Sequence, residues 1–114
     1  MRIEIKGRNV AVSDELRERI LKRSEKVARQ VSPLAVMDVE LSEERNPSIK
    51  DDQIAEITLR LKGVTLRASG RAPSMTHALN ETMDDLGRQV KRHRDKRRAR
   101  RVAREAEPRA ATSP

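Results

Sequence analysis

Residues 55–69 read AEITLRLKGVTLRAS, and this stretch decides the fold. Apolar side chains alternate with polar ones on both sides of Lys62-Gly63, which is the period of strands with one buried face. A short polar connection that contains glycine suits a tight turn between antiparallel strands. The stretch therefore predicts a β-hairpin with one apolar face, and that face needs a covering layer.

Two earlier segments show the same alternation. Residues 2–6 alternate charged side chains with isoleucine, and residues 35–41 place their apolar side chains on one face. Gly7 is expected to close the first of these strands, and the polar residues 42–52 are expected to form an exposed loop. We therefore expect four strands in all.

Two other segments have helical spacing. Ser13 offers a hydroxyl cap for an amphipathic helix over residues 14–30, and Ser32-Pro33 is expected to end it. Residues 70–73 are expected to break the chain after the hairpin, and Ser74 is expected to cap a second helix. The apolar stripe of this second helix consists of Ala78, Leu79, Met83, Leu86 and Val90.

The predicted element order is β-α-β-β-β-α. Because each strand has one apolar face, we expect an α+β two-layer sandwich, with one four-stranded sheet and both helices on one face. A right-handed first crossover would make the first two strands parallel. We expect residues 1–98 to form one domain and residues 99–114 to be a basic helical extension and flexible linker, unstructured from residue 105.

The surplus positive charge lies entirely in the last quarter of the chain. Through Gly87, fifteen basic residues balance fifteen acidic ones, whereas Arg88 to Pro114 contain eleven basic and three acidic residues and so carry the whole net charge of +8. Helix-favouring composition continues through Arg104, and the basic residues are expected to surround the helix axis. A neutral body with a cationic arm indicates a polyanionic partner, most often nucleic acid, although a solvated basic linker has the same composition.

The chain lacks residues that several classes of function require. The chain contains no cysteine, which excludes disulfides, thiolate metal sites and cysteine nucleophiles. His77 and His93 have no nucleophile near them in the sequence, and paired acids such as Asp84-Asp85 point apart on a helix or strand. We therefore expect no enzyme, no cofactor, no metal and no small-molecule substrate.

The composition also limits the ways in which the chain could bind RNA or a membrane. There is no Phe, Tyr or Trp on which RNA bases could stack, so the affinity must come from Lys and Arg meeting phosphates. No apolar stretch approaches the ~20 residues of a membrane span, and the N-terminus has no signal-peptide pattern. We expect a cytoplasmic protein that does not bind membranes.

Five short motifs occur in order along the chain. Residues 3–9 read IxIxGRN, 12–17 VSDELR, 55–59 AEITL, 74–79 SMxxAL and 85–96 DLxRQVKRHRxK. In this order and spacing the motifs resemble the ribosome hibernation-promoting factor family. The resemblance implies the same β-α-β-β-β-α fold, which is similar to double-stranded RNA-binding domains.

The resemblance also implies a partner and a set of contacts. Members of the family bind the small ribosomal subunit and its rRNA in the mRNA channel, over the A and P tRNA sites, and shut down translation. The RNA contacts would lie on the basic end of the second helix and on the first helix. For the first helix, an equal alternative is that its basic residues only face solvent and bind nothing. The implied contact residues are Lys22, Arg23, Lys26, Arg88, Lys91, Arg92, Arg94, Lys96, Arg97 and Arg98.

Two other functions stay open at this point. One is a general double-stranded RNA-binding module, and the other is an interaction module whose basic arm docks an acidic protein. Long members of the family add a C-terminal domain that joins two ribosomes, so the sequence is either the N-terminal part of a longer protein or a short member with an unusual tail. We expect the 114-residue chain to be a monomer that acts on single ribosomes.

Overall fold

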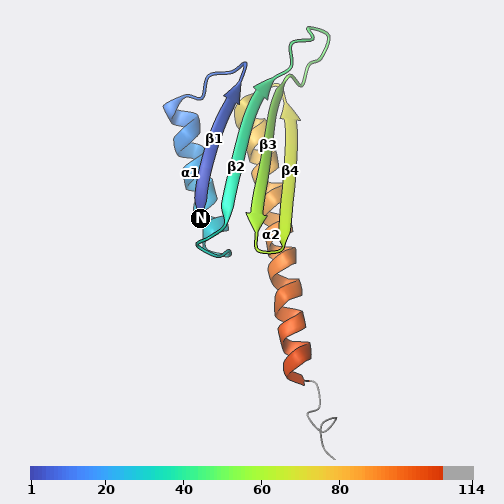
Figure 1. Ribbon diagram of the computed structural model, residues 1–114. Coiled ribbons are helices and arrows are strands. Elements are labelled where there is room, and N and C mark those ends of the chain that lie inside the picture. The colour runs from blue at the N-terminus through green and yellow to red at the C-terminus, as the bar shows by residue number, and fades with distance from the viewer. Residues whose placement is uncertain (107–114) are drawn as a thin grey trace, which may run out of the picture.

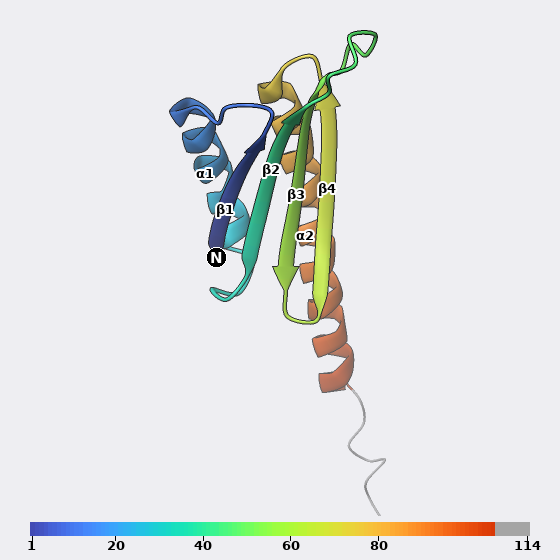
Figure 2. The ribbon, with the colours of Figure 1, turned by 45° about the horizontal axis from the view of Figure 1, so that its top comes forward.

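The computed structural model describes residues 1–106, which form one sheet covered by two helices (Figure 1). The sheet contains, in spatial order, β1 (Arg2–Arg8), β2 (Val36–Glu43), β3 (Gln53–Leu61) and β4 (Val64–Ala72). The helices are α1 (Asp14–Ala28) and α2 (Met75–Ala106). Both lie on the same face of the sheet, as the two views of the ribbon show (Figures 1 and 2). The α+β two-layer sandwich and its β-α-β-β-β-α order are confirmed.

The strand pairing follows the predicted pattern. β1 is parallel to β2, whereas β2–β3 and β3–β4 are antiparallel. The hairpin turns at Lys62 and Gly63, with Leu61 opposite Val64, and Gly63 has a φ of +78°. Glycine adopts this backbone region more readily than residues with a Cβ atom, which explains why the turn falls there.

The core lies between the sheet and the helices. It is built from apolar side chains of β2, β3 and α2, from Ala68 and Ala72 of β4, and from Ile20 and Val27 of α1. Two buried hydroxyls are satisfied within it: Ser24 donates to the Ile20 carbonyl, and Thr82 donates to the Ala78 carbonyl at 2.7 Å. Because each hydroxyl bonds its own helix, both helices can press a polar residue against the sheet at little cost.

Gly70 lies inside β4, so the expected chain break over residues 70–73 is wrong. A Cβ atom at this position would lie 2.6 Å from Thr82 Oγ1 and 2.9 Å from the Ala78 carbonyl oxygen. Gly70 therefore lets α2 approach the sheet closely while the strand continues to Ala72. In a sequence, a glycine that ends a strand and one that admits a helix look alike.

Smaller differences occur at the ends of the elements. Gly7 lies within β1, and a Cβ there would lie 2.3 Å from the Val10 carbonyl, so the residue admits the following turn. The Ser13 hydroxyl accepts from the Leu16 N–H at 3.1 Å, which confirms the predicted cap of α1, but the helix ends at Ala28, before residue 30.

Helix α2 is the longest element. The Ser74 hydroxyl accepts from the His77 N–H, as predicted, and the buried stripe runs to Val90. The 32 residues correspond to ~48 Å, of which the part after Val90 projects beyond the sheet (Figure 1). Glu105 and Ala106 are helical, contrary to expectation, and residues 107–114 of the predicted linker lie outside the described residues.

Candidate nucleic-acid interface

A groove of about 1110 Å³ runs between α1 and α2 on the helical face of the molecule. Its floor contains Val27, Met83 and Gly87. Charged side chains form most of its walls, and seven are basic against three acidic: Glu15, Glu18, Arg19, Lys22, Arg23, Lys26, Asp84, Arg88, Lys91 and Arg94. We call this hollow the interhelical groove. Its net positive charge and its open shape suit an extended anion.

The structure brings together six of the ten predicted contact residues in this groove. They come from both helices: Lys22, Arg23 and Lys26 from α1, and Arg88, Lys91 and Arg94 from α2. A smaller second hollow contains Arg97 and Arg98 and shares Gln30 and Arg94 with the groove. Arg92 and Lys96 line neither hollow. The two sets of basic residues, more than sixty positions apart in sequence, therefore form one continuous surface.

Sequence reasoning missed two cations of this surface. Arg19 lines the interhelical groove one turn before Arg23, and Arg101 lines the second hollow one turn after Arg97. The signal was available, because residues four apart on a helix share a face. Extending the predicted contacts by one turn in each helix would have included both arginines.

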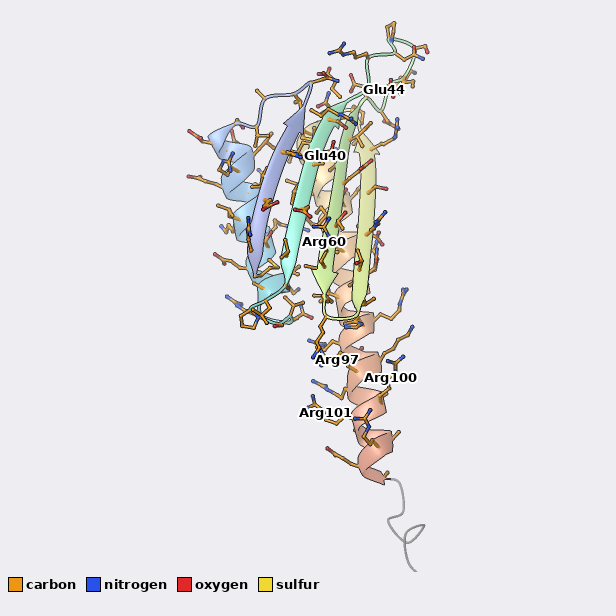
Figure 3. All side chains as sticks on the ribbon, in the orientation of Figure 1. Glu40, Glu44, Arg60, Arg97, Arg100 and Arg101 are labelled. Carbon is orange, nitrogen blue, oxygen red and sulfur yellow. The ribbon has the colours of Figure 1, made fainter. Side chains whose placement is uncertain are left out.

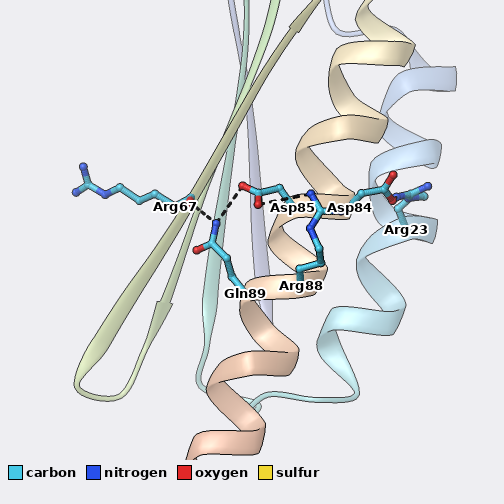
Figure 4. A network of polar contacts seen from close by, with 6 residues as sticks. All are labelled: Arg23, Arg67, Asp84, Asp85, Arg88 and Gln89. Carbon is cyan, nitrogen blue, oxygen red and sulfur yellow. Dashed lines mark hydrogen bonds and ion pairs between the residues drawn. The ribbon is translucent and has the colours of Figure 1, made fainter.

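Ion pairs tie some of the predicted residues to the protein itself. Arg23 Nη2 lies 2.6 Å from Asp84 Oδ1, which joins α1 to α2 across the groove, and Arg88 Nη2 lies 3.7 Å from Asp85 Oδ1 (Figure 4). The Arg23 and Asp84 side chains are 37% and 60% exposed, so water weakens their attraction. An arriving anion would compete with Asp84 for the Arg23 guanidinium.

Gln89 fixes the same part of α2 to the edge of the sheet. Its Nε2 donates to the Arg67 carbonyl at 2.7 Å and to Asp85 Oδ2 at 3.1 Å (Figure 4). The first bond satisfies a carbonyl on the edge strand β4, and the second orients a carboxylate that also faces Arg88. The position of α2, and so of its basic face, is thus set by polar contacts as well as by the core.

Arg94 stands where the two hollows meet. Its Nη1 donates to Gln30 Oε1 at 3.1 Å, and Gln30 Nε2 in turn donates to the Lys26 carbonyl at 3.1 Å. Arg94 Nε is buried and has no hydrogen-bond acceptor among the described residues, the Asp95 carboxylate being 3.7 Å away. Arg94 therefore links α2 to Gln30, just after the end of α1.

The projecting part of α2 is exposed and strongly basic. Along this helix Ala99, Val102 and Ala103 share one side, because they are three and four residues apart. Arg97 and Arg101 point the same way in Figure 3, and Arg100 points to the opposite side of the helix. Arg97 and Arg101 also line the second hollow, so this side of the helix continues the line of the interhelical groove.

The open face of the sheet has a different electrostatic character. Three of its cations pair with acids on the same face, Arg2 with Glu4, Arg8 with Glu40 and Arg60 with Asp38, whereas Lys6, Arg67 and Arg71 form no ion pair within residues 1–106. Glu40 and Arg60 can be located in Figure 3. The basic residues that line a common hollow lie on the helical face and the projecting helix.

Within residues 1–106, no three His, Asp or Glu side chains are grouped so that they could hold a metal ion. None of the helices in this part of the chain has a stretch long and apolar enough to cross a membrane. His77 is exposed at the start of α2.

Comparison with known proteins links the chain to a family. Residues 3–98 match the family model described as "Sigma 54 modulation protein / S30EA ribosomal protein". A ribosome hibernation promotion factor of Picosynechococcus is 27% identical over 84% of this chain and 50% of its own length. A ribosome hibernation promoting factor of Salmonella typhimurium is 30% identical over 84% of this chain and 96% of its own length.

A solved structure has a similar fold. The crystal structure of the Thermus thermophilus Protein Y N-terminal domain superposes with a TM-score of 0.69 at 26% identity, and the match covers 82% of this chain and 99% of that domain. The chain thus spans about half the length of the Picosynechococcus relative and nearly the whole of the Salmonella one.

Proposed function

Because the chain belongs to the Sigma 54 modulation protein / S30EA ribosomal protein family, we propose that it binds the small ribosomal subunit through its rRNA and promotes ribosome hibernation. The bound domain would occupy the mRNA channel and the A and P tRNA sites, and so would block translation sterically. The role is one of binding rather than catalysis, and it places the protein in the cytoplasm.

One observation carries this proposal: basic residues from two distant segments converge on a single surface. Lys22 and Lys26 of α1 face Lys91 and Arg94 of α2 across the interhelical groove, and Arg97 continues the surface along the projecting helix. Such an elongated cationic surface suits the phosphates of an RNA strand, whereas Arg2, Arg8 and Arg60 of the open sheet face are engaged by acids of the protein. The absence of aromatic residues supports recognition of the backbone rather than of stacked bases.

The proposal is tested by co-sedimentation of the purified chain with small ribosomal subunits over a series of salt concentrations. If six or more basic residues meet phosphates, the log–log plot of affinity against salt should have a slope of about −4 or steeper, at ~0.7 per contact for non-duplex RNA. A slope near −1 would contradict the phosphate-based account. Excess free duplex RNA is included as a competitor in the same experiment.

The competitor separates the alternatives. Binding that survives excess duplex supports a ribosome-specific site, whereas equal loss to the duplex identifies a general double-stranded RNA-binding module. If nuclease treatment of the subunits leaves binding unchanged, the basic arm docks an acidic protein instead.

Asp84→Asn should tighten binding to small subunits by about 3–10-fold, or ~1 kcal/mol. The substitution removes a negative charge from the middle of the groove and frees Arg23 from its ion pair. The folded chain should lose at most ~1 kcal/mol, because the pair is substantially exposed. Asp51→Asn, in the exposed loop before β3, is the control and should leave affinity unchanged. Equal or weaker binding by Asp84→Asn would argue against anions reaching Arg23.

A further inference from the structure

Gly87 is an unusual residue for its position. It lies inside α2, with twelve helical residues before it and nineteen after it, far from either end of the helix. Glycine is the least favourable residue in a helix interior apart from proline, because it loses the most backbone freedom when the helix forms. Its presence here therefore lowers the stability of the fold relative to alanine.

Packing within the chain does not require this glycine. A Cβ atom built at Gly87 meets nothing within 4 Å, whereas one built at Gly70 would lie 2.6 Å from Thr82 Oγ1. Gly70 is thus explained by the close approach of α2 to the sheet, but Gly87 has no such neighbour. The space beside Gly87 is not filled by any other part of the described chain, so it is open to a partner molecule.

The open space at Gly87 is the floor of the interhelical groove. On α2, Met83 lies one turn before Gly87 and Lys91 one turn after it, and all three line the groove. Lys22 and Lys26 line it from α1. The bare main chain of α2 is therefore exposed between two walls that carry lysine side chains.

We propose that Gly87 is a contact site for the RNA backbone, where a ribose–phosphate segment lies directly against the main chain of α2. This inference rests on the proposed function and specifies how deeply the strand enters the groove. A strand seated at Gly87 places its phosphates within reach of lysines from both helices at once. A side chain at this position would lift the strand out of the groove and lengthen the contacts on both walls.

The test compares Gly87→Ala and Gly87→Leu with the unmodified chain, measuring the melting temperature and the affinity for small ribosomal subunits. The melting temperature of Gly87→Ala should rise by about 2–8 °C, because alanine favours the helix. Its affinity should nevertheless fall about tenfold, since charge-assisted contacts are lengthened, and Gly87→Leu should lose more. Gly63→Ala adds the same methyl group in the hairpin turn and should lower stability without weakening binding.

A Lys91→Glu variant measured in parallel separates the two levels of the argument. If Lys91→Glu weakens binding and Gly87→Ala does not, the proposed RNA contact at Gly87 is wrong while the proposed function stands. If neither variant changes the affinity, the proposed function fails as well. A fall in the melting temperature of Gly87→Ala would mean that the space beside Gly87 is not open in the folded chain. It would also overturn the proposed RNA contact at Gly87.

Discussion

Replacing Lys22, Lys26 and Lys91 together with Glu is expected to weaken binding to small ribosomal subunits by about 10³-fold or more. All three side chains are exposed and line the interhelical groove, so each reversal turns an attraction for phosphate into a repulsion. A cost of ~1.4 kcal/mol for each reversal gives this factor. The affinity is measured by co-sedimentation at fixed salt, and circular dichroism checks that the fold is retained.

The matched control reverses the same number of charges on the other side of the molecule. Lys6, Arg67 and Arg71 are exposed residues of β1 and β4, and their side chains form no ion pair within residues 1–106. The triple Glu variant at these positions has the same net charge as the groove variant. It should lose no more than about tenfold, through the general field of the protein. Equal losses in both variants would show that net charge, and not the groove, determines binding.

Leu86→Ala should lower the free energy of unfolding by ~2–5 kcal/mol, the largest stability effect that we expect from a single substitution. Leu86 is 0% exposed and lies in the core beneath α2, so truncation leaves a cavity between the helix and the sheet. Urea denaturation, with the m-value checked for constancy, measures the change. At temperatures where the variant is folded, its ribosome affinity should match that of the unmodified chain.

Val102→Ala is the control for this experiment. Val102 belongs to the same helix but is 58% exposed on the projecting part, so its truncation should change the free energy of unfolding by no more than ~0.5 kcal/mol. A comparable loss in both variants would mean that residues beyond Val90 contribute to the core.

Most of the fold could be predicted because the deciding signals are local. The hairpin needs only the alternation around Lys62 and the glycine at position 63, and both caps, Ser13 and Ser74, precede their helices directly. Gly70 was misread because its role depends on Thr82, which approaches only after α2 has packed on the sheet. Local patterns identify elements, whereas close approaches between elements require the assembled structure.

The candidate site shows the same division. The charge gradient identified the basic residues of α2, but their meeting with Lys22 and Lys26 depends on how α1 and α2 lie on the sheet. The pair between Arg23 and Asp84 joins residues 61 positions apart, which no spacing rule predicts. That both partners are charged and helical was visible in the sequence; that they pair across the groove was not.

The continuity of α2 has a consequence for how the projecting arginines are presented. A helix of sixteen residues rich in like charges would barely form alone, because its first turn is costly and arginines such as Arg97 and Arg101, four apart, repel each other. In this chain the buried turns up to Val90 are already helical, so the projecting residues only extend an existing helix. The hydrophobic core therefore acts as the nucleus of the cationic helix, and any loss of core structure should also unwind the row of arginines.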